Sequence, residues 1–418
     1  MTFKFIKTKS ILSIEGILGV ALGTGFLTEI RFWGLIGFPE IFMIFAILLL
    51  VLKNHNRIFY YENNFFFLPK LYLIISTFII LPIVTLISQF NGVPGIHVED
   101  ILVFMLNILL FYFLVEALKK DLDFRTVVIF ALISFGLALI IGQMFFGKHI
   151  LFWHQAEQYK IGSGPHGILV LLEGYSGGRY TGGATDPNQM AFYLLGLLFL
   201  ASFYLNKFWF IILFIMFFLL GNKTGSDGFM LGAVCIGIFY ILMQFIYIKI
   251  LPLRINLIIF GLIFLSLFIY TDLLTYIIDY IKSGDESGYR AKLLETSFEV
   301  IKNNPIVGLG AGAFVGESML QGKEAHNTFL DLAMMFGILF PTIIYLIFTT
   351  FVINLFLNKQ YFSSATLIGF MALSVTHFVA RHFIFWIILA FIVSELLKSK
   401  KSFENKKIDN FIIKKLEG

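Results

Sequence analysis

Long, uninterrupted apolar runs constrain the fold of this chain more than any other feature of its sequence. A helix needs about 20 mostly apolar residues to cross a bilayer, and run after run is close to that length. The runs cover residues 11–29, 33–52, 71–89, 100–118, 126–146, 189–206, 208–221, 228–248, 255–271, 327–353, 362–380 and 383–397. The sequence therefore predicts an all-α, polytopic membrane protein with about 12 transmembrane helices.

The composition excludes whole classes of protein. The chain is 58% hydrophobic and 14% charged, and its mean hydropathy is +0.88. A soluble domain has roughly 45–50% apolar and about 25% charged residues. This chain cannot cover itself with a polar surface, so we exclude a soluble enzyme, a disordered protein and a nucleic-acid-binding domain. Cys235 is the single cysteine, which rules out an intramolecular disulfide and a metal site built on several cysteines.

Basic residues orient the predicted helices. With the N-terminus inside, 20 of the 31 Lys and Arg residues fall in inside segments, whereas the short outside turns hold Arg31, Lys223 and Arg381. This distribution follows the positive-inside rule. We therefore expect both termini on the cytoplasmic side, with the basic tail 398–418 resting on the anionic inner leaflet.

Two longer polar stretches, 147–188 and 272–326, interrupt the apolar pattern. Both fall outside in this topology. The sequence has no internal repeat or low-complexity linker, so residues 1–418 are interpreted as one transmembrane domain with a first and a second outer loop.

The first outer loop ends in a glycine-rich segment, residues 177–188, that contains Arg179. Asp186, Pro187 and Asn188 are a suitable helix start, with Asp186 near the N-cap and Pro187 in the first turn. The segment is then either a turn and cap beside a solvated Arg179, or a phosphate site made by helix N-terminus, backbone amides and guanidinium.

The second outer loop contains an amphipathic helix, predicted over 290–303 and ended by Asn304-Pro305. A glycine-rich segment, 306–314, follows. Gly308, Gly310 and Ala313 formally fit a dinucleotide-binding pattern, but the segment follows a helix and opens no βαβ unit. We interpret it as a glycine loop packed against the membrane face.

His326 lies at the outer start of the tenth run, in Glu324-Ala325-His326-Asn327. A lone histidine here is ordinarily a cap or core residue, but an imidazole also exchanges protons near neutral pH. Glu324 or Asp331 is expected to set its tautomer.

Lys223 is either a snorkelling lysine or a cation of the outer site. The remaining histidines, including the pair His377 and His382, do not form a ligand cluster, so no metal site is predicted.

Three motifs appear in order along the chain and together resemble a known family. They are Arg179-x-Thr-Gly-x-x-x-Asp186-Pro187-Asn188, then Asn304-Pro305-x-x-Gly308-x-Gly310-x-Gly312-x-Phe314, then His326-Asn327-x-x-Leu330 with Gly337 beyond. With the twelve spans, this set resembles the Wzy-type O-antigen polymerase and O-antigen ligase superfamily, mainly over residues 175–345. The resemblance implies a GT-C-like, metal-independent glycosyltransferase that needs no cofactor and acts on the periplasmic face of the bacterial inner membrane.

The resemblance also implies roles for individual residues. Arg179 and Arg290 would hold the pyrophosphate of an undecaprenyl-pyrophosphate donor, and His326 would activate the acceptor hydroxyl. Lys223 departs from the Ser-Arg pair that members often carry, and lysine keeps the charge but loses the bidentate fork of arginine. Nearby polar residues are expected to support these groups: Asp186, Asn188, Glu324 and Asn327.

Several functions remain open. The first is a polymerase that joins lipid-linked repeat units into an O-antigen or capsular chain. An O-antigen ligase or a protein O-oligosaccharyltransferase would use the same chemistry. A flippase or transporter is less favoured, because the carboxylates near the spans, Glu15, Glu40 and Glu116, form no obvious relay. A structural protein without catalysis is the last alternative. The expected partners are lipid-linked donor and acceptor, membrane lipid and a chain-length regulator protein, with no nucleic acid.

Overall fold

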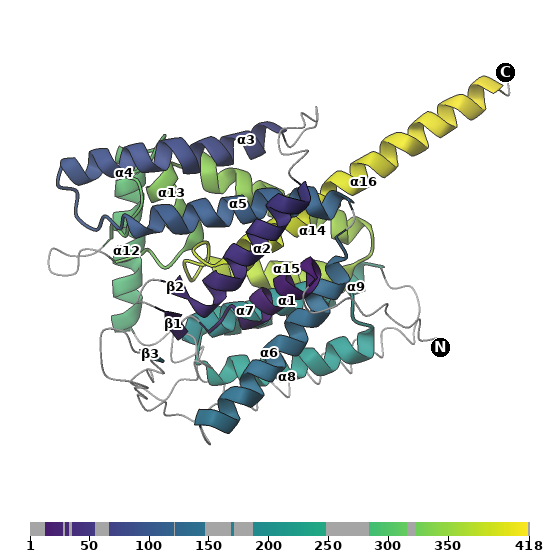
Figure 1. Cartoon of the computed structure of the whole chain (residues 1–418), viewed down its shortest axis with the longest axis horizontal. Helices are drawn as coiled ribbons and strands as arrows, with labels where there is room; N and C mark the ends of the chain where they lie inside the picture. The colour runs from purple at the N-terminus through teal and green to yellow at the C-terminus, as the bar shows by residue number, and fades with distance from the viewer. Residues whose placement is uncertain are drawn as a thin grey trace.

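Long helices packed side by side make up most of the molecule, and Figure 1 shows them as one bundle. The computed structural model describes residues 13–27, 30–32, 36–54, 67–120, 122–146, 169–170, 187–247, 284–315 and 323–416. The helices of the first half are α1 (Ile14–Thr24), α2 (Phe38–Asn54), α3 (Phe67–Ile75), η2 (Ser76–Ile80), α4 (Leu81–Phe90), α5 (Glu99–Lys120) and α6 (Phe124–Phe146). Those of the second half are α7 (Pro187–Ala201), α8 (Lys207–Lys223), α9 (Asp227–Tyr247), α12 (Gly284–Asn303), α13 (Thr328–Phe336), α14 (Leu339–Leu357), α15 (Tyr361–Ser374) and α16 (Phe383–Leu416).

A small antiparallel sheet adds to the predicted all-α fold. Its strands are β1 (Ile30–Phe32), β2 (Ile36–Gly37) and β3 (Leu169–Val170), in the order β2-β1-β3. Strand β3 lies within the predicted first outer loop and pairs with β1, which follows α1. The helical architecture is confirmed, and the sheet joins residues 169–170 to the segment after α1.

The core is centred on α7 and the first half of α16. Every described side chain of α7 from Met190 to Ala201 is buried, and a helix that is apolar all round belongs inside a bundle. In α16, Trp386 is fully buried and its indole N–H donates to the carbonyl of Ala380 at 2.7 Å. Rings of α16 pack on their neighbours, as where Phe391 stacks on Phe124 with ring centroids 5.0 Å apart.

The outer surface of the bundle is apolar, which is the pattern of a protein that lipid surrounds. In the helix that contains α4, Ile79, Ile83 and Ile87 are each about half exposed, with 52–53% of their surface accessible, whereas Thr85 and Ser88 are buried. Water would favour the opposite arrangement. Within the described residues, three helices are long and apolar enough to cross a membrane: Leu68–Phe90, Glu99–Lys119 and Leu339–Leu357. Shorter apolar helices accompany them, and the chain is a multi-pass membrane protein.

The tenth apolar run, predicted as a single span over 327–353, is two helices. Helix α13 ends at Phe336, and α14 begins at Leu339. Gly337 lies between them with φ of 84°, a left-handed conformation that ends a helix and suits glycine. The run carries no charge at this point, so hydropathy alone did not separate the helices. The ninth run, 255–271, lies outside the described residues.

Helix α12 and the end of α16 run in other directions than the helices beside them. In Figure 1, α12 runs crosswise to α4 and α5 near one end of the bundle, while the last part of α16 projects from the opposite side. Helix α12 begins at Gly284, six residues before the predicted helix 290–303, and ends at Asn303 as predicted. Helix α16 continues through the predicted basic tail to Leu416.

Candidate functional site

The glycine-rich segment after α12 packs against the loop between α4 and α5. The N–H of Ala311 donates to Thr85 Oγ1 at 2.8 Å, and the Ala311 carbonyl accepts from the N–H of His97 at 3.1 Å. The N–H of Ala313 donates to the Gly95 carbonyl at 2.8 Å. These bonds fasten two segments that are more than 200 residues apart in sequence. They hold the glycine-rich segment against the end of the bundle where α5 begins.

The same segment also packs on the last turn of α13. The N–H of Leu309 donates to the Met334 carbonyl at 2.7 Å, and that of Gly310 donates to Met335 at 3.1 Å. These carbonyls lie in the last turn of α13, where intrahelical partners run out. The interpretation as a packed glycine loop is confirmed, because its backbone groups are used for packing between helices.

His326 lies on the segment that leads into α13. Its side chain is exposed, and its backbone has φ of 52°, a left-handed conformation uncommon outside glycine. Asn327 is the N-cap of α13, and its side-chain oxygen accepts from the N–H of Leu330 at 3.1 Å. The His326 ring lies 6.4 Å from that of His377, centroid to centroid. The imidazole is thus presented at the surface next to the start of a rigid, buried helix.

Asp331 lies beneath this segment and is 3% exposed. Its two carboxylate oxygens accept backbone N–H groups from Ala325, at 2.8 Å, and Asn327, at 3.1 Å. Burial raises the pKa of Asp331 to about 8, with a further contribution from the nearby charge of Glu324, while the two backbone hydrogen bonds and Arg381 oppose the rise. A carboxyl is therefore buried in an apolar helix to hold the backbone on both sides of His326.

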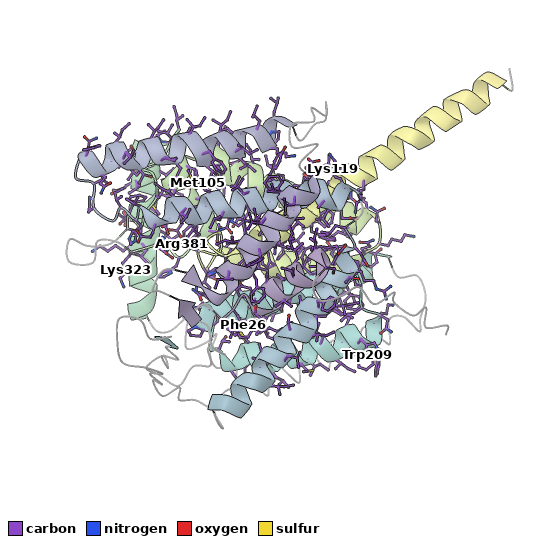
Figure 2. All side chains as sticks on the ribbon, viewed as in Figure 1. Phe26, Met105, Lys119, Trp209, Lys323 and Arg381 are labelled. Carbon is purple, nitrogen blue, oxygen red and sulfur yellow. The ribbon has the colours of Figure 1, made fainter. Side chains whose placement is uncertain are left out.

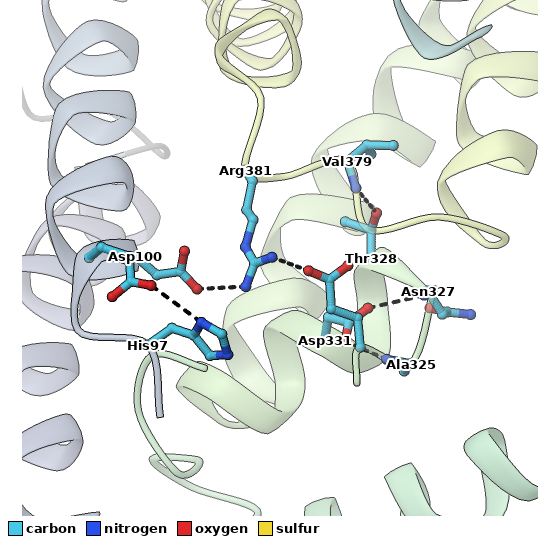
Figure 3. A network of polar contacts seen from close by, with 10 residues as sticks. His97, Asp100, Ala325, Asn327, Thr328, Asp331, Val379 and Arg381 are labelled. Atoms are coloured by element: carbon cyan, nitrogen blue, oxygen red, sulfur yellow. Dashed lines mark hydrogen bonds and ion pairs between the residues drawn. The ribbon is translucent and has the colours of Figure 1, made fainter. Parts of the chain in front are cut away.

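Arg381 joins three separate segments at the same end (Figure 3). From the loop before α16, its guanidinium donates to Asp100 at the start of α5, at 2.6 Å, and to Glu324 beside His326. The guanidinium also lies over the Phe378 ring, 5.1 Å from the centroid. Asn107 donates to the Arg381 carbonyl at 3.0 Å. Two carboxylates and an aromatic ring thus fix one cation, as is usual for arginine in a partly buried site.

The charge of Arg381 is stabilised by its partners. Burial alone would lower the pKa of the guanidinium, but Glu324 and then Asp100 outweigh burial and raise the pKa above its ordinary value. Glu324 therefore pairs with Arg381, just as Asp331 accepts hydrogen bonds from two backbone amides. The hydrogen bonds described for both carboxylates go to groups other than the imidazole, so the expectation that Glu324 or Asp331 sets the tautomer of His326 stays a prediction.

The turn between α15 and α16 connects His326 to the start of α9. Thr328 Oγ1 donates to the His377 carbonyl at 2.6 Å and accepts from the N–H of Val379 at 2.9 Å. Gly228, in the first turn of α9, lies so close that a Cβ placed there would be 2.9 Å from Cδ2 of His377. The start of α9, just after the turn that follows Lys223, and the segment that carries His326 therefore contact the same loop.

The structure describes some of the predicted site residues and not others. Lys223 is the exposed last residue of α8, and Asn188 is the half-buried second residue of α7. Arg290 lies in α12, and its side chain is outside the described residues. Arg179 and Asp186 also lie outside them, although α7 begins at Pro187 as predicted. The structure brings Glu324, His326 and Asn327 together at the base of α13.

Sequence reasoning missed the central position of Arg381 and Asp100. Arg381 stood out only as one of three cations in short outside turns, and Asp100 was not singled out. Their pairing joins positions 281 residues apart, and no motif in a single sequence reports such a contact. In the described part of the chain, no three His, Cys, Asp or Glu side chains gather in a way that could hold a metal ion.

A comparison with protein families matches a continuous segment of the chain that includes much of this site. Residues 210–340 match the O-antigen ligase family, Wzy_C. The match confirms the resemblance to the Wzy-type polymerase and O-antigen ligase superfamily, whose members are glycosyltransferase-like membrane enzymes. The Wzy_C segment covers about a third of the chain and includes the Lys223 turn, the glycine loop and His326. Comparison with curated proteins gives no match.

Proposed function

We propose that the chain is a polysaccharide polymerase. It transfers a glycan from an undecaprenyl-pyrophosphate donor to a sugar hydroxyl of another lipid-linked repeat unit, in O-antigen or capsule biosynthesis. The observation that carries this proposal is the Wzy_C match, which includes both Lys223 and His326, together with the exposure of His326 at the end of the bundle where the loops meet. A lipid-anchored donor must react beside the bilayer, and a site at the helix ends meets that requirement.

The proposal includes a topology of twelve spans, GT-C-like, in the bacterial inner membrane. Both termini are cytoplasmic, and the site faces the periplasm. Support comes from the two lysines that gather at the Lys119 end of α5. Figure 2 labels Lys119 at one end of this helix and Arg381 and Lys323 toward the other. Lys70 and Lys119 contact Glu116 at 2.6 and 3.4 Å at the proposed cytoplasmic end, in keeping with the positive-inside rule.

The proposed reaction requires a base and a set of cations. His326 removes the proton of the acceptor hydroxyl as its oxygen attacks the anomeric carbon of the donor. The bond between this carbon and the pyrophosphate oxygen breaks, the electron pair leaves with undecaprenyl pyrophosphate, and the proton remains on the imidazole until solvent takes it. The transition state places negative charge on the leaving group, so cations there lower the barrier.

Arg179, Lys223 and Arg290 are the proposed cations, with Asp186, Asn188, Glu324 and Asn327 in supporting positions. Lys223 is the exposed last residue of α8, and the turn after it leads to α9, where Gly228 lies against His377. Because His377 is also the ring neighbour of His326, this contact supports a shared site for Lys223 and His326. Arg381 has a different role in the proposal, since Asp100 and Glu324 neutralise it.

An O-antigen ligase is the second candidate, favoured by the description of the matched family. A ligase, or a protein O-oligosaccharyltransferase, would use the same donor and base with a different acceptor. The Asp186-Pro187-Asn188 element and the modest length of the outer loops favour the polymerase. A chain-length regulator protein is the expected protein partner of a polymerase.

Reconstitution of the purified protein in proteoliposomes separates the two candidates. With a lipid-linked repeat unit as the only substrate, we expect a ladder of polymer that forms equally well with EDTA. Product that forms only when lipid A–core or a protein acceptor is added would favour the ligase instead. Absence of transfer to any of these acceptors would reject the glycosyltransferase proposal, and inhibition by EDTA would reject its metal independence.

A further inference from the structure

Asp331 holds the backbone on both sides of His326. Its Oδ1 accepts the N–H of Ala325 and its Oδ2 accepts the N–H of Asn327, so each oxygen has a different neighbour of His326. Asp331 belongs to α13, in which all residues except Phe329 are buried. The two hydrogen bonds therefore connect an exposed residue to one of the most firmly packed helices at this end of the bundle.

The His326 backbone needs such support. Its φ of 52° is unfavourable for a residue with a Cβ, and strained conformations of this kind persist only where surrounding contacts enforce them. Thr328 fastens the next part of the segment to the His377 loop from the other side. The segment is thus fixed at residues 325, 327 and 328, while the imidazole of His326 remains exposed.

An ordinary helix cap does not account for this arrangement. Asn327 already caps α13, with its side-chain oxygen accepting the N–H of Leu330. Ala325 lies two residues before the cap, outside the helix, yet its N–H donates a hydrogen bond to Asp331 Oδ1 at 2.8 Å. Burying a carboxyl costs free energy unless hydrogen bonds compensate, and here the compensating bonds both flank His326.

We propose that Asp331 is a positioning residue that holds the His326 backbone in its left-handed conformation and so aims the imidazole at the acceptor hydroxyl. The last clause rests on the proposed function, whereas the backbone restraint does not. Asp331 acts without touching the imidazole, through the peptide groups on either side of it. Its loss should therefore slow the proton-transfer step more than it weakens acceptor binding.

Hydrogen exchange on the full chain in lipid nanodiscs tests the backbone restraint directly. In Asp331→Asn, one acceptor oxygen becomes an amide NH2, which cannot accept, so at least one of the amides of Ala325 and Asn327 should exchange about tenfold faster while those inside α13 keep their protection. Asp331→Glu keeps the carboxyl group but displaces it by one methylene and should give intermediate rates. Ser226→Ala, which removes the buried N-cap hydroxyl of α9, is the matched control and should leave both amides unchanged.

Two exchange results would overturn the proposal. The first is unchanged exchange at Ala325 and Asn327 in both Asp331 variants. The second is an equal loss of protection throughout α13, which would assign Asp331 a purely structural role in the helix.

Turnover by the same proteins tests the effect on catalysis. We expect Asp331→Asn to lower kcat by about ten- to a hundredfold with KM within about threefold, since a small misplacement of a catalytic group costs rate rather than binding. If Asp331→Asn speeds exchange at Ala325 or Asn327 but leaves kcat unchanged, the claim that Asp331 aims the imidazole of His326 is overturned. If the wild-type protein transfers no glycan while exchange responds as predicted, the proposed function fails and the restraint stands.

Discussion

At the scale of single residues, Arg381 connects segments that are distant in the sequence. It binds Asp100 from α5 and Glu324 from the segment before α13, and it does so from the loop before α16. Its side chain is 27% exposed, and that of Asp100 is 9% exposed. Removing one partner of a buried ion pair leaves the other charge without compensation, which costs far more than the pair itself contributes.

Replacing Arg381 should therefore destabilise the end of the bundle. We expect Arg381→Met to lower the free energy of unfolding by about 2–3 kcal/mol, less than the 3–5 kcal/mol typical of fully buried pairs because solvent screens part of this one. Thermal unfolding in nanodiscs measures the change. Lys398→Met is the matched control, because Lys398 pairs with Glu395 at the exposed surface of α16 and should cost less than about 1 kcal/mol. Equal losses in the two variants would show that Arg381 has no special structural role.

Arg179 and Arg290 are expected to act through positive charge on the pyrophosphate. At each position, replacement by Ala should lower turnover more than replacement by Lys, because Lys keeps the charge while losing the bidentate fork. A reconstituted polymerisation assay measures both pairs. Equal loss in Ala and Lys variants would argue against simple charge stabilisation.

At the scale of elements, the glycine loop holds α4, α5 and α13 together. Gly310 has φ of 89° and lies so close to Thr85 that a Cβ would be 2.6 Å from its backbone. Such close approach allows the hydrogen bonds between Ala311 and Thr85 and between Gly310 and Met335 to form. The loop thereby places the start of α13, and with it His326, against the rest of the bundle.

Two glycine variants separate backbone strain from close packing. Gly92 also has a positive φ, 68°, but nothing lies within 4 Å of its Cβ position. Gly92→Ala should therefore cost only about 1–2 kcal/mol of stability. Gly310→Ala adds a clash with the Thr85 backbone and should cost about 2–5 kcal/mol, with loss of transfer activity. Similar unfolding temperatures and activities for the two variants would contradict the packing role of the glycine loop.

The bounds of the helices and strands show which parts of the fold the sequence could predict. Runs of apolar residues gave the helices to within a few residues, as with α5, because burial in lipid requires a minimum length of apolar chain. The break at Gly337 within the tenth run was missed, since the chain is apolar on both sides of this glycine. The strands β1 and β3 were missed because they are two or three residues long and carry no alternation that distinguishes them from a loop.

At the scale of the whole molecule, the bundle brings together at one end residues that the sequence spreads over nearly 300 positions. Local motifs were enough to select His326, Asn327 and the glycine loop. They could not reveal that Asp331 binds the backbone around His326 or that Arg381 engages Glu324, because both arrangements depend on helix packing. The apolar exterior places the protein in the membrane, and this end of the bundle is where the proposed glycosyl transfer occurs.

His326 is the residue on which that account depends most. The most direct measurement is the rate of polymer formation by reconstituted His326→Ala, compared with the wild-type protein and with His97→Ala. His97 is a matched control, a partly exposed histidine at the same end whose ring contacts Glu99. We predict that His326→Ala lowers the rate by about 10²–10⁴-fold, as loss of a general base does, while the protein remains folded in the membrane and His97→Ala stays within about threefold of wild type. A full ladder of polymer from His326→Ala at the wild-type rate would contradict the account.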